Sequence, residues 1–188
     1  MTKRRIGRSI LDALGGLPLF VTPPLYRHWH LRWGTSLRAG GLEVEAAPVP
    51  KIEPAEATGV DLLVVGGPTH VHGMSRSSTR RTAADDKKNS FAEPTVAPGL
   101  REWMDGLPSQ AERLAAAFDT RIDRPAFLTG SAAKGIARRL KLHGYRLVVG
   151  PESFLVSMNN SLLEGEAGRA TTWGAELAER ATSGVIVG

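Results

Sequence analysis

The sequence predicts an α/β fold in which helices cover both faces of a parallel β-sheet. Residues 61–66 (DLLVVG) are continuously apolar after the aspartate, as expected of a strand that is buried on both faces. Strand-like and helix-like segments alternate along the chain, which is typical of this class. The apolar run ends directly in the loop GGPTHVHGM. Ligands of such folds bind where the strands end, so this loop is a candidate binding edge.

The first elements are read from the N-terminal third of the chain. A strand is predicted at Leu17–Thr22 (LPLFVT), and the segment Leu42–Val49 (LEVEAAPV) begins with the apolar-charged alternation of another strand. Between them, one apolar stripe predicts a helix that ends at Gly40-Gly41; it consists of Leu25, Trp29, Trp33 and Leu37.

The later elements have clearer boundaries. A helix is predicted from Pro98 to Leu107, and a second runs from its cap at Ser131 to Gly144. Residues 113–118 (RLAAAF) are ambiguous, because the propensities of alanine and leucine favour helix while a short central strand stays open. A strand at residues 146–150 and a helix over about residues 164–180 complete the pattern.

The composition is that of an ordinary globular protein. The chain has 188 residues, of which 41% are hydrophobic and 23% charged, and this length fits one domain with an appendage. The absence of cysteine excludes disulfides, thiolate zinc sites and cysteine nucleophiles. No apolar run approaches the roughly 18–20 residues of a membrane span, and the N-terminus lacks a clear signal-peptide pattern. We therefore expect a cytoplasmic protein.

The positive charge is concentrated near the N-terminus. The net charge of the whole chain is +5, whereas residues 1–41 alone carry seven basic residues against Asp12. We interpret residues 1–16 as a basic arm and residues 17–188 as the folded domain. A solvated arm is favoured over a nucleic-acid contact, because no groove-reading or base-stacking motif accompanies the charges.

Several segments resemble FMN-binding proteins of the flavodoxin family. They are VDLLVVGGPTHVHGMSR, PGLREWMDGLP, AAAFDTRI, LTGSAAKGIARRL and GPESFLV, and the resemblance covers about residues 42–180. It implies a flavodoxin-like three-layer sandwich with strand order 2-1-3-4-5, and it favours a strand for the ambiguous alanine segment. It also implies three loops around FMN. The second is formed by Gly67, Pro68, Thr69, His70, Val71, His72, Gly73 and Met74, and the third by Asp119, Thr120 and Arg121.

These residue types suit a flavin. An isoalloxazine ring needs apolar walls and backbone groups close to its polar edge. Glycines permit close backbone approach, Thr69 offers a hydroxyl, and His70 or His72 can stack on the ring or donate to it. Met74 offers a soft apolar face, and Arg121 can pair with an anionic reduced flavin or a phosphate. No residue stands out as a catalytic acid or base.

Other interpretations of the same residues remain open. The glycines and Pro68 can form a purely structural turn, and Asp119 with Arg121 can form a surface ion pair. A metal site at His70 and His72 is disfavoured, because imidazoles two residues apart on an extended chain point to opposite faces. A serine hydrolase is disfavoured because Ser131 lies in GSAAKG and no G-x-S-x-G motif occurs.

The N-terminal region departs from the family pattern. After the strand predicted at residues 17–22, the sequence Thr22-Pro23-Pro24 stands where a phosphate-binding loop is expected, and prolines lack N–H donors. Residues 1–40 are either a divergent segment or a reading-frame or start-site artefact. Two functions follow: an FMN protein in electron transfer or flavin-dependent oxidoreduction, or a flavodoxin-fold scaffold that has lost flavin. The redox partner is unknown, and a homodimer is possible.

Overall fold

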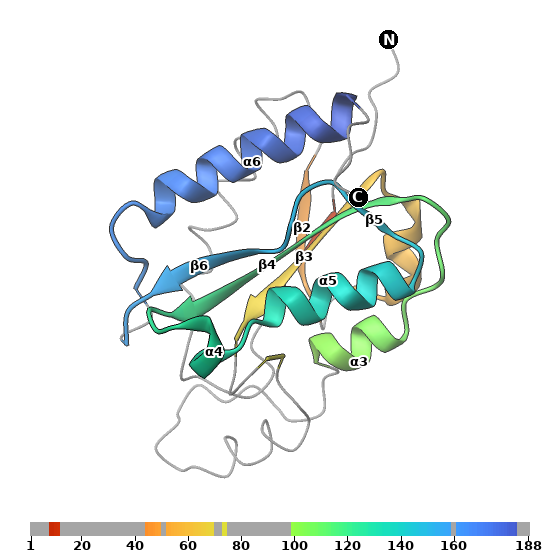
Figure 1. Cartoon of the computed structure of the whole chain (residues 1–188). Helices are drawn as coiled ribbons and strands as arrows, with labels where there is room; N and C mark the ends of the chain where they lie inside the picture. Colours follow the sequence, from red (N-terminus) through yellow and green to blue (C-terminus); the bar gives the residue numbers. More distant parts are fainter. Residues whose placement is uncertain are drawn as a thin grey trace.

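The computed structural model contains one parallel sheet between two helical layers (Figure 1). It describes residues 8–11, 44–49, 52–69, 73–74, 99–158 and 161–183. The strands are β1 (Arg8–Leu11), β2 (Glu45–Pro48), β3 (Leu62–Pro68), β4 (Leu114–Ile122), β5 (Arg146–Leu147) and β6 (Glu152–Val156). The helices are the 3-10 helix η2 (Pro54–Gly59), α3 (Leu100–Asp105), α4 (Ala126–Thr129), α5 (Ala132–Leu142) and α6 (Glu166–Ser183).

The strand order confirms the predicted fold class. Among the described residues the sheet has the order β2-β1-β3-β4-β5, β6 pairs with β4, and every pairing between these strands is parallel. Figure 1 shows α6 on one face of the sheet and α3 with α5 on the other. The carboxyl ends of the parallel strands therefore share one edge, as the sequence predicts.

The position of the first strand corrects the sequence interpretation. Its residues, Arg8–Leu11, belong to the segment assigned to the basic arm, and they pair with β2 on one side and β3 on the other. The strand predicted at Leu17–Thr22 and the helix after it lie outside the described residues. The domain boundary at residue 17 stays a prediction. The strand RSIL is short and follows several basic residues, so pairing within the sheet, rather than local pattern, identifies it.

The ambiguous alanine segment is a strand. Residues 115–120 of β4 are buried between β3 and the edge strands, so tertiary pairing overrides the helix propensity of its alanines. The fifth position of the sheet is divided between two strands. Arg146–Leu147 of β5 pair with the start of β4, whereas β6 pairs with Phe118–Ile122. The strand predicted at residues 146–150 is thus shorter, and β6 was not predicted.

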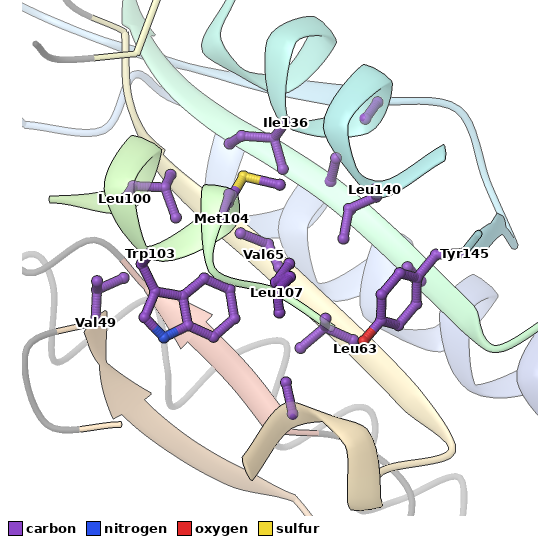
Figure 2. Packing of buried hydrophobic residues seen from close by; sticks show 14 of the residues in the cluster. Val49, Leu63, Val65, Leu100, Trp103, Met104, Leu107, Ile136, Leu140 and Tyr145 are labelled. Atoms are coloured by element: carbon purple, nitrogen blue, oxygen red, sulfur yellow. The ribbon is translucent and has the colours of Figure 1, made fainter. Parts of the chain in front are cut away.

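The two faces of the sheet bury separate apolar clusters. On the α3 and α5 side, Leu63 and Val65 of β3 pack with Trp103, Ile136 and Leu140 (Figure 2). Both predicted helices are present, and Ser131 caps α5 as predicted by accepting from the Lys134 backbone N–H. On the α6 side, the alternate strand residues form the second cluster; it includes Leu62, Val64, Ala116, Phe118, Phe154, Trp173 and Leu177.

Candidate functional site

The loops after β3 and β4 leave the sheet side by side. The register pairs Gly67 with Asp119 and Pro68 with Thr120. The backbone N–H of Thr69 then donates to the Thr120 carbonyl over 2.8 Å. The structure therefore brings the start of both predicted FMN loops to one edge of the sheet.

Several predicted loop residues belong to the strands themselves. Gly67 and Pro68 are buried at the end of β3, and Asp119, Thr120 and Arg121 lie within β4 rather than after it. The reason is pairing: β6 runs beside β4 as far as Ile122, so β4 continues beyond the expected end at Phe118. The loop after β4 therefore begins at Asp123.

Asp119 holds the edge together. Its side chain is 0% exposed, and its Oδ2 accepts hydrogen bonds from the Thr69 hydroxyl (2.9 Å), the Ser131 hydroxyl (2.8 Å) and the Ala133 backbone N–H (2.8 Å). The Thr69 hydroxyl oxygen in turn accepts from the Ala132 N–H over 2.8 Å. We call these side chains, Thr69, Asp119 and Ser131, the edge network. It links β3, β4 and the first turn of α5.

The Asp119 carboxyl group contacts the N-terminal turn of α5. A helix N-terminus stabilises negative charge, and Asp119 lies at the start of α5. Its Oδ1 is buried and has no hydrogen-bond partner in the part of the chain that the structure describes. Asp119 is enclosed, and its hydrogen bond from the Thr69 hydroxyl connects it to the first residue of the loop that follows β3.

The other predicted residues have varied surroundings. Met74 is buried in the α3 and α5 cluster, where the position of a Cβ on Gly135 would lie 3.3 Å from its methyl carbon. The Arg121 guanidinium donates to the Arg124 carbonyl over 2.6 Å, and no ion pair joins it to Asp119 within the described ranges. His70, Val71 and His72 lie outside the described residues, so their contacts stay predictions.

The sequence did not predict the exposed apolar side chains at the same edge. Phe127 in α4 is 81% exposed, Leu128 beside it is 57% exposed, and Met158 after β6 is 69% exposed. Asp123 N–H donates to the Val156 carbonyl, so the chain segments that carry these residues leave neighbouring strands. The sequence Arg-Pro-Ala-Phe could have indicated the exposure of Phe127, because it places an aromatic residue in a proline-containing turn directly after a strand.

The carboxyl end of β1 lies beside this edge, because Leu11 pairs with Gly66 near the end of β3. In the sequence β1 is followed by residues 12–16 (DALGG), which lie outside the described residues. This changes the interpretation of the phosphate loop, because Thr22-Pro23-Pro24 does not directly follow the strand. The segment that does follow has two glycines, a carboxylate and no hydroxyl.

The architecture and the position of the edge define a flavodoxin-like fold, and solved structures agree. A flavodoxin from the domain Archaea is 12% identical, with a TM-score of 0.60 over 94% of this chain and 99% of that chain. Oxidised flavodoxin 2 from Bacillus cereus is 14% identical, with a TM-score of 0.62 over 93% and 99%. No protein-family model matches the sequence, and no curated protein does. At such identities the likeness shows the fold alone.

A larger protein contains the same fold. Rubredoxin oxygen:oxidoreductase from Desulfovibrio gigas is 12% identical, with a TM-score of 0.55, and the match covers 97% of this chain but 37% of that one. The fold thus occurs both as a whole protein and as part of a longer chain. None of the helices in the described residues is long and apolar enough to cross a membrane.

Proposed function

We propose that the protein binds FMN at the carboxyl edge of its sheet and uses it in electron transfer or flavin-dependent oxidoreduction. The observation that carries the proposal is the paired exit of the chain from β3 and β4, closed by the hydrogen bond of 2.8 Å from Thr69 N–H to the Thr120 carbonyl. Flavodoxins of known structure, to which this fold is similar, support the choice of ligand.

The residues present fit a flat aromatic ring. Phe127 presents an aromatic face at this edge, and it is 81% exposed, so a ligand can contact it. Among the described residues, no atom lies within 4 Å of the position that a Cβ would take at Gly73, so none of them crowds the backbone at this point of the β3 loop. An aromatic wall and accessible backbone are what the ring requires.

We expect some of the predicted site residues to contact the flavin and others to support the loops. We expect Thr69, His70, His72 and Gly73 to contact the flavin, together with Phe127. We expect Gly67, Pro68, Met74, Asp119 and Thr120 to support the loops, because they are buried. Arg121 lies at the boundary, since its guanidinium folds over the turn after β4. FMN, when bound, supplies the redox chemistry, and the protein supplies binding, orientation and electrostatics.

The segment after β1 motivates a second candidate function. Hydroxyls and N–H groups normally anchor a phosphate at a helix N-terminus, but residues 12–16 have no hydroxyl and carry the carboxylate of Asp12. A flavodoxin-fold scaffold that has lost flavin is consistent with this composition. The two functions differ in one measurable property, which is the affinity for FMN.

A fluorescence titration tests the proposal. FMN fluorescence should be quenched when purified protein is added, and the absorbance bands of the flavin should shift on binding. Absence of detectable binding at high micromolar FMN would favour the scaffold. Riboflavin, titrated in parallel, measures what the phosphate adds. We expect riboflavin to bind nearly as tightly as FMN if residues 12–16 do not anchor the phosphate.

A substitution in α4 tests where the flavin ring binds. Phe127→Ala should weaken FMN binding about two- to tenfold, the range expected for loss of an aromatic stacking contact. Leu142→Ala is the matched control, because Leu142 is another exposed apolar residue (74%) but lies at the opposite end of α5. Equal affinities for the two variants would place the ring away from α4.

A further inference from the structure

The outer surface of α5 and the turn before it carry cations without acidic partners. Arg124, Lys134 and Arg138 are exposed, and none of them makes an ion pair within the residues that the structure describes. Asp123 is the exposed acid in this turn. Arg124 follows β4 at the edge where we propose that FMN binds, Lys134 lies in the first turn of α5, and Arg138 lies one turn further along that helix.

Helix stability does not explain these charges. Lys134 lies in the first turn of α5, where the helix dipole disfavours a cation. Lys134 and Arg138 are four residues apart, a spacing at which like charges repel. In α6, by contrast, Glu176 pairs with Arg180 over 2.8 Å, and Arg169 pairs with Glu166 over 2.7 Å. Arg139 of α5 likewise pairs with Asp105, whereas Lys134 and Arg138 on the same helix make no ion pair within the residues that the structure describes.

An exposed apolar residue lies close to these cations along the chain. Leu128 in α4 is 57% exposed, and along the chain it stands between Arg124 and Lys134. Figure 1 shows α4 at the carboxyl ends of β3 and β4, beside the start of α5. An exposed apolar centre with a charged rim is the usual anatomy of a protein–protein contact surface.

We propose that Arg124, Leu128, Lys134 and Arg138 form a docking surface for an acidic protein that exchanges electrons with the bound flavin. The proposal rests on the proposed function and names the class of its partner. Charge complementarity selects an acidic partner and speeds encounter. An aliphatic centre and the carboxylate of Asp123 favour a protein over the phosphate backbone of a nucleic acid, which would be attracted only by the cations.

The test uses an acidic [2Fe–2S] ferredoxin as the probe, with the full chain immobilised and its binding measured at low and high salt. Arg138→Glu should weaken binding about tenfold at low salt, because reversing one charge replaces an attraction by a repulsion. Arg180→Glu is the matched control, since it makes the same charge change on the opposite side of the sheet. Equal losses for both variants would overturn the proposal, because only net charge would then matter.

Two further measurements separate the alternatives. Leu128→Ser should weaken ferredoxin binding severalfold at both salt concentrations, because apolar contacts are not screened. The proposal would be overturned if Leu128→Ser left ferredoxin binding unchanged. It would also be overturned if a DNA oligonucleotide bound more tightly than ferredoxin. Each measurement is made with and without FMN. Docking without FMN binding contradicts the proposed function, whereas FMN binding without docking contradicts the docking surface alone.

Discussion

Two adjacent residues of β4 hold the two helical layers by different interactions. Phe118 points to the α6 side, where its ring meets Phe154 and Trp173 edge-to-face at centroid distances of 6.2 and 5.7 Å. Asp119 points to the α5 side, where it accepts three hydrogen bonds from Thr69, Ser131 and Ala133. Both faces of the sheet bury apolar clusters, but at these two residues the α6 side is held by ring packing and the α5 side by directional hydrogen bonds.

The difference matters for the candidate site. Apolar packing is non-directional, so it stabilises the layer without fixing the path of a loop. Hydrogen bonds to a buried carboxylate fix the positions of their donors, and one of those donors is the hydroxyl of Thr69. We infer that the α6 side supplies most of the stability at this edge, whereas the edge network fixes the loop after β3.

The largest expected effect comes from the aromatic side. Phe118→Ala should lower the free energy of unfolding by about 3–5 kcal/mol, because it removes a buried ring and leaves a cavity beside Phe154 and Trp173. Denaturant unfolding measures the loss. The affinity for FMN, measured where the variant is folded, should change little. A loss below about 1 kcal/mol would show that the aromatic cluster does not hold α6.

Gly66 offers a complementary substitution on the same face. The ring of Phe118 lies over Gly66, and a Cβ there would overlap the ring. Gly66→Ala should therefore cost about 1–3 kcal/mol through overpacking. Gly168→Ala in α6 is the control, because no atom of the described residues lies within 4 Å of its Cβ position and alanine favours helix. A loss of this size would also indicate that Gly66 is needed for packing against Phe118 rather than for close approach of the backbone to a flavin.

An intermediate effect is expected from the polar side. Asp119→Asn should lower the free energy of unfolding by about 2–3 kcal/mol, since hydrogen bonds to a charged group are among the stronger ones. Unlike Phe118→Ala, it should also weaken FMN binding, because an uncharged amide oxygen is a weaker acceptor for the Thr69 hydroxyl than a carboxylate oxygen. Asp105→Asn is the control, as this exposed aspartate pairs with Arg139 over 3.2 Å at the surface of α3 and α5. Unchanged FMN affinity in Asp119→Asn would show that the edge network is structural only.

The sequence predicts the helical layers and β3 because their signals are local. The caps and stripes of α3 and α5 and the apolar run of β3 can each be read from a short window. Strand β1 could not be found in this way, because Arg8–Leu11 is identified by pairing with β2 and β3, which lie far along the chain. The same reason explains why β4 extends over Asp119, a residue that disfavours strands.

Only part of the candidate site could be predicted from the sequence, again because some of its signals are local and others are not. The turn signal Gly-Gly-Pro-Thr marks the end of β3, so the edge of the sheet that holds the candidate site could be predicted from sequence. The role of Asp119 depends on Ser131 and Thr69, which lie 12 and 50 residues away along the chain. A sequence window gives no information on such contacts, nor on the exposure of Phe127.

The smallest expected effect tests a polar group that lacks partners on the α5 side. The Tyr145 ring lies among apolar side chains (Figure 2), and its hydroxyl has no hydrogen-bond partner within the described residues. Burial raises the pKa of Tyr145, and the nearby charge of Arg113 opposes the shift. The folded state therefore keeps the proton at a pH where the unfolded chain has lost it. Stability attributable to this residue is present below about pH 10 and falls as the pH rises further.

Tyr145→Phe should remove that alkaline loss and change the free energy of unfolding at neutral pH by less than about 1 kcal/mol, because the hydroxyl makes no hydrogen bond that could be lost. Urea unfolding of both proteins at pH 7 and above pH 10 measures the difference, and every other titrating group cancels between them. Parallel pH profiles would contradict the prediction. The contrast with Asp119 is then direct: on the same face of the sheet, a buried polar group stabilises the fold only where donors or acceptors meet it.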